Sequence, residues 1–457
     1  MNLLVGSLGR LHLTILRYCL GLFLGLALLM PSQGFAKGKA DNELVAYVFE
    51  PGDTLIALAR KYLRKRSDYK AVQRLNRIKD PHQISVGRTV QIPFRLLKFR
   101  PSEASLSAFR GDISIASAGQ QLAPVKGLDI GEGSQLTTAT RSFITLQLED
   151  GSRISMPSNS QIRISRLRHI LLTDSIDYEI TVDKGRIRSK VAPLDNRSDR
   201  HRVRTPVAVS AVRGTDFRTR VDALSGTAFS ETVEGEVELA SEVGSADTPA
   251  VSLPAGTGAA ATSTGELAKV ELLDPPELID PAKVQSDAEL QFAFAPSGPA
   301  LGHRINISSD AGFVDIVAEQ QSDGNNLALP SLPDGRYFLK AVSLAREGFE
   351  GMPVTYGFKR QLSTLGGSAS SGDFGYQFKW FGEGSGKRYY RFQLIRDSKS
   401  AVPMVDETGL VVQALTLSDL PDGDYFWRVG VTQFSTDTSD RESVQKWTDF
   451  EKLTVVN

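Results

Sequence analysis

The chain has 457 residues, and its 53 Lys and Arg residues balance its 53 Asp and Glu residues. This length exceeds what one ordinary hydrophobic core supports, so about three domains are expected. The balanced charge excludes a whole-chain field that would draw the protein to nucleic acid, and no nucleic-acid partner is expected. The hydrophobic content of 41% is that of a globular protein, and 40 glycines among short alternating segments indicate a multidomain, mainly β fold.

The N-terminus has the pattern of a secretion signal. Arg10 and Arg17 precede the uncharged run Cys19–Met30, which a small-residue Gly-Phe-Ala exit follows. The run is twelve residues long, whereas a membrane-spanning helix needs roughly 20. We predict a signal peptide over residues 1–36, cleavage after Ala36, and a periplasmic protein that has no membrane span once the signal is removed. An uncleaved membrane anchor is the alternative.

Cysteine and histidine usage bounds the chemistry. Cys19 is the only cysteine, so the cleaved chain would contain none, which excludes disulfides, thiol catalysis and thiolate metal sites together. The histidines beyond the signal are isolated and lack a metalloprotease or serine-hydrolase motif. We expect neither a metal site nor a cofactor. An exported chain without disulfides fits a bacterial envelope.

Residues 44–95 alternate strand, helix, helix and strand. Tyr47–Phe49 is the first expected strand, a turn at 51–54 follows, and the apolar positions from Leu55 onwards have helical spacing. A second helix is expected to end near Asn76, before the second strand. In the simplest interpretation, the Asp and Thr side chains of the turn only cap the first helix and Asn76 only terminates the second.

This layout resembles the LysM module. The resemblance rests on Gly52-Asp53-Thr54-Leu55, Asn76, Ile84, Gly87 and Ile92-Pro93. It implies a small βααβ fold that binds N-acetylglucosamine-containing glycans, in bacteria usually peptidoglycan. The sugar would lie in a shallow groove between the turn before the first helix and the loop before the second strand, where backbone amides would bond its acetamido group. The glycan-binding residues that the resemblance implies are Gly52, Asp53, Thr54, Leu55, Asn76, Asp80, Pro81 and Ile84.

The stretch between the two helices departs from that pattern. Residues 64–68, Arg-Lys-Arg-Ser-Asp, are longer and more basic than usual. They belong to the most basic part of the chain, residues 43–100, which has thirteen Lys or Arg against five Asp or Glu. Attraction to the carboxylates of peptidoglycan stem peptides would be salt-sensitive. An ordinary solvated face is the alternative interpretation.

Residues 104–260 are expected to be almost entirely β. Period-two alternation runs into Asp-Gly, Lys-Gly and Glu-Gly turns at 150–151, 184–185 and 234–235. The last strand is expected around Val251–Leu253, and a loose connection is expected after it.

One motif in this region is specific. Thr205-Pro206 ends one expected strand, and Arg213-Gly214-Thr215 turns into the next. The series resembles the FecR domain, which implies an envelope β-domain; in the founding member it is periplasmic and relays a signal from an outer-membrane transporter. We expect an architectural role, in which Gly214 permits a positive φ and Arg213 satisfies carbonyl groups or a carboxylate. A ligand-contacting role is the alternative.

The C-terminal half contains an internal repeat. Leu329–Leu344 matches Leu417–Thr432 at a spacing of 88 residues, and each copy has Leu-Pro-Asp-Gly before a Tyr-aromatic strand. This corner resembles fibronectin type III or related immunoglobulin-like domains. We predict a linker over 261–283 and two β-sandwich repeats over 284–365 and 366–457.

These patterns favour a non-enzymatic periplasmic protein that binds peptidoglycan and holds its β-domains against an envelope protein partner. A FecR-like envelope signal sensor is the alternative. A wall hydrolase is a third interpretation, which the lack of a recognisable acid/base or metal constellation disfavours.

Overall fold

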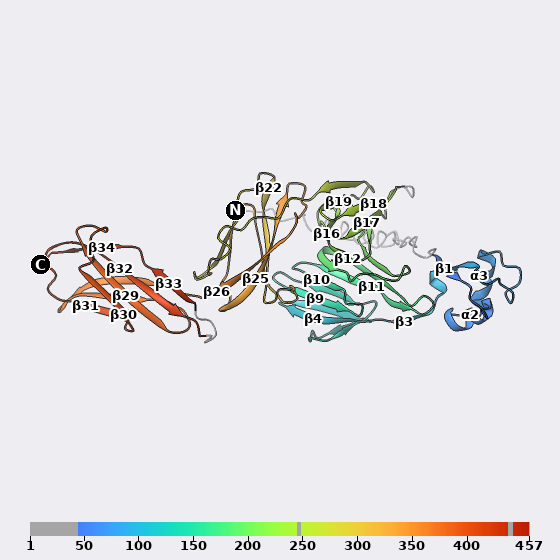
Figure 1. Cartoon of the computed structure of the whole chain (residues 1–457), viewed down its shortest axis with the longest axis horizontal. Helices are drawn as coiled ribbons and strands as arrows, with labels where there is room; N and C mark the ends of the chain where they lie inside the picture. The colour runs from blue at the N-terminus through green and yellow to red at the C-terminus, as the bar shows by residue number, and fades with distance from the viewer. Residues whose placement is uncertain (1–43, 245–247, 437–441, 457) are drawn as a thin grey trace, which may run out of the picture. The chain divides into compact units, whose positions relative to one another are not determined.

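The computed structural model describes residues 44–244, 248–436 and 442–456. The predicted signal peptide, residues 1–36, lies outside the described residues. The chain divides into two compact units, residues 1–98 and 99–457, which are described separately here. It is mainly β (Figure 1). Within the described ranges, no helix combines the length and apolar character that crossing a membrane requires.

The first unit has the expected βααβ order. Strand β1 (Leu44–Val48) pairs antiparallel with β2 (Thr89–Pro93), and between them lie α2 (Leu55–Tyr62), the 3-10 turn η2 (Arg66–Asp68) and α3 (Tyr69–Leu75). A second 3-10 turn, η3 (Phe94–Leu96), follows β2. The helical stripe and alternate strand positions form the core, which contains Val45, Leu55, Leu58, Ala59, Leu63, Val72, Val90 and Ile92.

The second unit begins with a continuous strand system that closes on itself, from β3 to β20. Its strand pairings define two sheets that share strand β12 (Ser175–Lys190). Beside β12, the first sheet contains β3 (Phe99–Pro101), β5 (Ile113–Ser117), β6 (Gln120–Leu122), β8 (Gln135–Thr138), β11 (Gln161–Ile170), β13 (Arg200–Arg204), β14 (Ala208–Val212), β17 (Glu236–Ser241) and β18 (Val251–Pro254). The second contains β4 (Ala104–Arg110), β7 (Asp129–Ile130), β9 (Phe143–Leu148), β10 (Arg153–Met156), β15 (Asp216–Val221), β16 (Ala228–Glu234), β19 (Thr257–Ala261) and β20 (Leu267–Glu271). One apolar core serves both sheets.

The Lys-Gly pair at 184–185 lies inside β12, so the hairpin turn predicted there is wrong. Up to Lys184 the strand pairs with β11, and from Gly185 it pairs with β15 in the other sheet. Gly185 has φ 77°, and a Cβ atom there would lie 2.4 Å from the carbonyl oxygen of Asn159. Glycine is therefore needed where the strand passes between sheets, and its local sequence looks like that of a turn.

The segment predicted as a linker, 261–283, is structured at both ends. Strand β18 confirms the predicted strand, but β19 and β20 follow it and pair with each other. Leu278 is buried in the core of the first repeat, and Ile279 N–H donates to the carbonyl oxygen of Ala293 at 2.8 Å. Apolar residues among the prolines thus continue the strand systems on either side.

The first repeat is a β-sandwich of two sheets around its own core. One sheet pairs β21 (Leu290–Ala293) with β24 (Asn326–Leu329). The other has the order β23 (Ile316–Ser322), β22 (Ala300–Ser308), β25 (Gly335–Ala345) and β26 (Val354–Arg360).

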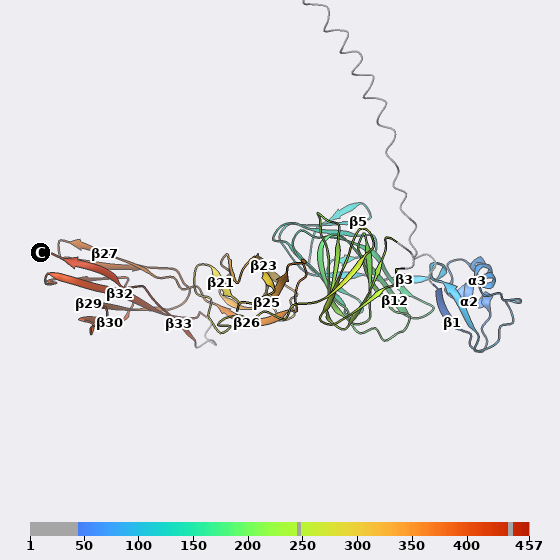
Figure 2. The ribbon, with the colours of Figure 1, turned by 90° about the horizontal axis from the view of Figure 1, so that it is seen from above.

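The second repeat is also a two-layer sandwich (Figure 2). One sheet has the order β27 (Gly366–Gly372), β28 (Gly375–Phe381) and β31 (Ala414–Leu417). The other has the order β30 (Val405–Leu410), β29 (Arg388–Arg396), β32 (Gly423–Phe434) and β33 (Ser443–Trp447), with β34 (Glu451–Val455) also on β32.

The same corner hydrogen bond occurs in each of the two repeats. The Tyr337 hydroxyl donates to the carbonyl oxygen of Pro333 at 3.0 Å, and the Tyr425 hydroxyl donates to that of Pro421 at 2.7 Å. The two tyrosines are 88 positions apart, as are the two prolines, which is the predicted repeat spacing. A tyrosine that fixes a strand corner in this way is typical of immunoglobulin-like sandwiches.

Candidate functional site

The turn before α2 is built by glycine and an aspartate. Asp53 N–H donates to the carbonyl oxygen of Glu50 at 3.1 Å, and Gly52 occupies the third position of this turn with φ 91°. No atom lies within 4 Å of a Cβ built on Gly52, so this corner is open on its outer side.

The two polar side chains of the turn have different roles. Thr54 is the N-cap of α2, because its Oγ1 accepts a hydrogen bond from Ala57 N–H at 3.1 Å. Asp53 does not cap the helix; its Oδ2 accepts from the Tyr47 hydroxyl at 2.8 Å and from Glu50 N–H at 3.0 Å. Burial raises the pKa of Tyr47, and the bond to the Asp53 carboxylate raises it further. Asp53 therefore ties the turn to β1.

The loop before β2 is joined to this turn by the backbone. Leu55 N–H donates to the carbonyl oxygen of Pro81 at 3.1 Å. Asp80 shapes the loop, since its Oδ1 accepts from His82 N–H at 2.8 Å. The predicted halves of the groove, residues 52–55 and 77–84, therefore lie against each other. Together with Glu50 and Pro51 of the turn, we call them the loop pair (residues 50–55 and 77–84).

The loop pair carries backbone donors that the protein does not use. Within the described residues, the loop-pair amides that make no hydrogen bond are those of Gly52, Thr54, Lys79, Asp80 and Ile84. Gly52 is exposed, and Thr54 and Ile84 are half-buried. Water or a ligand carbonyl can satisfy donors of this kind, and the half-buried Ile84 also carries an apolar side chain.

Two of the predicted site residues are committed to the interior of the module. Leu55 is fully buried. The Asn76 amide donates to the carbonyl oxygens of Val72 at 2.8 Å and Gln91 at 2.6 Å, and its Oδ1 accepts from Gln91 N–H at 2.7 Å. Asn76 thus joins the end of α3 to β2, and both N–H donors of its side chain are used inside the module.

The basic run between the helices is solvent-exposed. Residues 64–66 are exposed, and Asp68 closes the turn by accepting from Lys65 N–H at 3.1 Å.

The Thr-Pro…Arg-Gly-Thr motif, which we call the clamp motif (residues 205–206 and 213–215), makes hydrogen bonds to the protein backbone. Thr205 Oγ1 accepts from Ala208 N–H at 3.0 Å, and Thr215 Oγ1 donates to the carbonyl oxygen of Glu236 at 3.0 Å. The Arg213 guanidinium donates to the carbonyl oxygens of Asn196 at 2.8 Å and Arg197 at 3.3 Å.

Gly214 and Pro206 complete this motif. Gly214 has the expected positive φ, 76°, and a Cβ there would lie 2.9 Å from Pro193 Cα. Pro206 is exposed at the turn before β14. These contacts join the turn between β14 and β15 to β17 and to residues 193–197, and the architectural role of the motif stays a prediction.

Comparison with protein-family models gives two matches. The LysM domain model matches residues 47–93, and the FecR protein model matches residues 134–238. The chain contains a LysM domain and a FecR domain. The loop pair belongs to the LysM domain, and the clamp motif belongs to the FecR domain. Both domain types are typical of cell-envelope proteins. Comparison with curated proteins gives no match.

Comparison with solved structures gives partial matches. A candidate anti-sigma factor from Parabacteroides distasonis is 17% identical with a TM-score of 0.25, and the match covers 30% of this chain and 59% of that one. The chicken CNTN1 FN1–FN3 domains are 14% identical with a TM-score of 0.21, over 51% of this chain and 99% of that one. A two-domain fibronectin type III segment of chicken tenascin is 17% identical with a TM-score of 0.19, over 38% and 98%.

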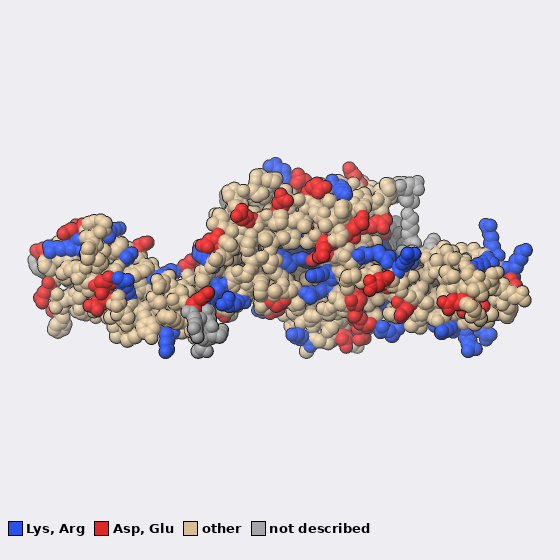
Figure 3. Space-filling model, viewed as in Figure 1, with Lys and Arg blue, Asp and Glu red and all other residues tan. Residues whose placement is uncertain are grey.

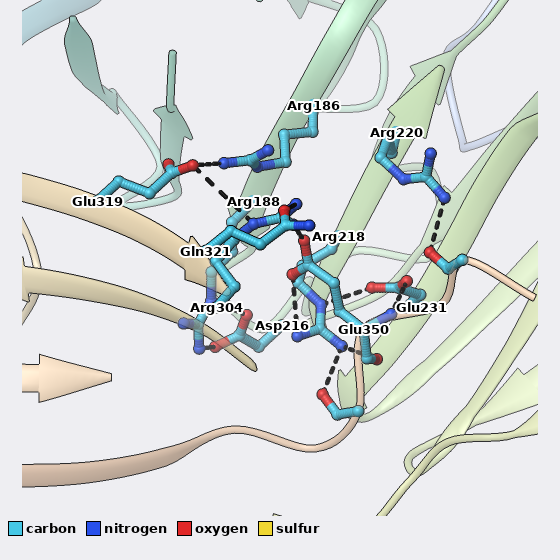
Figure 4. Close-up of polar contacts among 12 residues, drawn as sticks. Arg186, Arg188, Asp216, Arg218, Arg220, Glu231, Arg304, Glu319, Gln321 and Glu350 are labelled. Atoms are coloured by element: carbon cyan, nitrogen blue, oxygen red, sulfur yellow. Dashed lines mark hydrogen bonds and ion pairs between the residues drawn. The ribbon is translucent and has the colours of Figure 1, made fainter. Parts of the chain in front are cut away.

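The sequence interpretation missed a charged junction between the FecR domain and the first repeat. The loop after β25, residues 346–353, packs there, with Phe349 edge-to-face on Phe229 at 5.1 Å between ring centroids. Arg218 donates to the carbonyl oxygens of Glu350 at 2.7 Å and Gly351 at 2.9 Å (Figure 4). The available signal was arginine at alternate strand positions, 186 and 188 in β12 and 218 and 220 in β15, which puts four cations on one sheet face.

Proposed function

We propose that this chain is a non-enzymatic periplasmic protein that binds N-acetylglucosamine-containing glycan, in the form of peptidoglycan, through the loop pair of its LysM domain. The observation that carries the proposal is the presence of unused backbone amides, among them those of Gly52, Thr54 and Ile84, in two loops that a backbone hydrogen bond holds together. Such donors suit an acetamido carbonyl, and the Ile84 side chain suits its methyl group.

We propose fewer glycan-contacting residues than the sequence predicts. Gly52, Thr54, Pro81 and Ile84 form the proposed contacts. Asp53 and Asp80 shape the two loops, and Leu55 and Asn76 support them from inside. A site of this size buries little of the sugar, so each contact is weak. Retention on the wall then depends on rebinding along a polymer with many repeated sites, which raises the effective concentration.

Replacing Ile84 by aspartate is expected to weaken binding of an N-acetylglucosamine tetramer at least tenfold, because a carboxylate would face the acetamido methyl group without a partner. Isothermal titration calorimetry on the full chain measures this. Val86→Asp is the matched control. Val86 is 62% exposed and lies just after the loop pair, so this variant should bind the tetramer as tightly as the wild type does. Equal affinities of the two variants would show that the sugar does not use the loop pair.

A second candidate function rests on the FecR family match. A FecR-type domain that receives a signal from a membrane partner would use the residue 134–238 region, and the clamp motif would hold that surface rigid. This function predicts a protein that crosslinks to the FecR domain in cells and a regulatory phenotype on its deletion. The tether function alone predicts neither.

A further inference from the structure

A cavity of about 80 Å³ lies at the junction of the FecR domain and the first repeat. Strands β12, β15 and β16 line one side, and β22, β25 and the residue 346–353 loop line the other. Six cationic side chains line it: Arg186, Arg188, Arg218, Arg220, Arg304 and Lys340. Basic side chains also gather on the molecular surface around this junction (Figure 3).

Every arginine of this set has a carboxylate partner. The five ion pairs are Arg186–Glu319, Arg188–Asp216 at 2.6 Å, Arg218–Glu231 at 2.7 Å, Arg220–Asp222 at 3.6 Å and Arg304–Glu350. Figure 4 shows most of these residues converging from the two domains. The pairing leaves one positive charge in the lining, that of Lys340.

Lys340 has no ion pair and no hydrogen bond to any residue that the structure describes. Its Nζ lies over the ring of Phe313, 3.7 Å from the ring centroid, in a cation–π contact. The loss of water around it and, to a smaller extent, the positive charge of Arg188 lower the pKa of Lys340 to about 7. An ammonium group without a counter-ion at a cavity wall is unfavourable, and an anion in the cavity would relieve it.

We propose that this cavity is a binding site for a small organic monocarboxylate, whose carboxylate pairs with Lys340 and whose apolar part lies against Phe313, Ile316 and Val342. Lys340 is the one cation of the lining without a carboxylate partner among the described residues, which matches the single charge of a monocarboxylate. The apolar part of the lining favours an organic acid over an inorganic anion. At roughly 10–15 Å³ for each water-sized occupant, the volume suits about five to eight non-hydrogen atoms.

The site should depend on pH. The charged groups around Lys340 are Arg153 from β10, Arg188 and Lys190 from β12, and Asp216 from β15, and Asp216 is held by Arg188. Only the protonated amine attracts a carboxylate. With a pKa of about 7, the protonated fraction of Lys340 falls about tenfold between pH 6 and pH 8, so the affinity should fall by the same factor. Binding near neutral pH should take up a proton, which makes the heat of binding depend on the buffer.

The test is calorimetric titration of the full chain with sodium propionate at constant ionic strength. The proposal expects saturable binding at pH 6, about tenfold weaker binding at pH 8, and none with propionamide, which has the same shape without the charge. In Lys340→Met, binding should be lost while the fold is kept, because a charge without a partner is replaced by an apolar chain of similar length. Lys379→Met, on an exposed position of β28, is the matched control and should bind as the wild type does.

Three outcomes would overturn the proposal: no binding of propionate by the wild type, equal binding by Lys340→Met, or binding of inorganic phosphate in preference to propionate. Circular dichroism and the fluorescence of the second repeat, which holds all three tryptophans, show whether each variant is folded.

Discussion

Replacing Arg218 by methionine is expected to detach the first repeat from the FecR domain. Arg218 is 9% exposed, pairs with the 3% exposed Glu231, and donates to two carbonyl oxygens of the docked loop. Burial raises the pKa of Glu231, and the nearby Arg218 charge opposes that rise. Without the arginine, a buried carboxylate is left unpaired, which costs about 3–5 kcal/mol.

Hydrogen exchange measures this loss directly. The Glu350 amide, which donates to Glu231 at 2.7 Å, should exchange much faster in Arg218→Met, as should the rest of the residue 346–353 loop. Arg391→Met is the matched control, since its bidentate pair with Asp406 is exposed and contributes little to stability. A double variant with Glu231→Gln should recover part of the protection. Unchanged exchange in Arg218→Met would mean that the charged cluster does not hold the junction.

Replacing Gly185 by alanine is expected to destabilise the FecR domain by about 2–5 kcal/mol. Alanine at φ 77° is strained by about 1–2 kcal/mol, and its Cβ would lie 2.4 Å from the backbone oxygen of Asn159, which has no flexible end that can move away. The crossing of β12 between the two sheets should loosen first.

The matched control separates strain from collision. Gly133 also has a positive φ, 90°, but nothing lies within 4 Å of a Cβ there, so Gly133→Ala should show the conformational cost alone. Hydrogen exchange of β12 and β15 reports the effect. Tryptophan fluorescence should be unchanged, since Trp380, Trp427 and Trp447 all belong to the second repeat. Equal destabilisation by the two substitutions would show that the close approach to the Asn159 oxygen adds nothing to the loss of stability.

Sequence reasoning succeeded where the determining contacts are local or repeated. The βααβ order follows from strand and helix periodicity, and Thr54 caps α2 as its position predicts. The strand corners at Tyr337 and Tyr425 could be predicted because the same sequence motif occurs in both repeats. At 184–185 the same logic failed, because glycine at a turn and glycine at a strand crossing need the same backbone freedom.

The remaining features depend on contacts between distant residues. Nothing local in Asn76 shows that its amide meets the backbone of Gln91, and this long-range contact turns a predicted ligand residue into a structural one. The unpaired state of Lys340 likewise follows only after every arginine of the cavity lining has found its carboxylate in the folded chain. Period-two arginines indicated a charged sheet face, but not which loop covers it.

The most direct test of the glycan-tether proposal is co-sedimentation of the chain from Lys37 onward with purified, protein-free peptidoglycan. It should be run with and without residues 43–100, over a salt series. We expect pelleting that requires this segment and persists at moderate salt, because the amides of the loop pair carry no net charge. Pelleting that disappears with salt would assign the binding to the exposed basic run instead. If the intact chain stays in the supernatant at every salt concentration, the glycan-tether proposal is wrong.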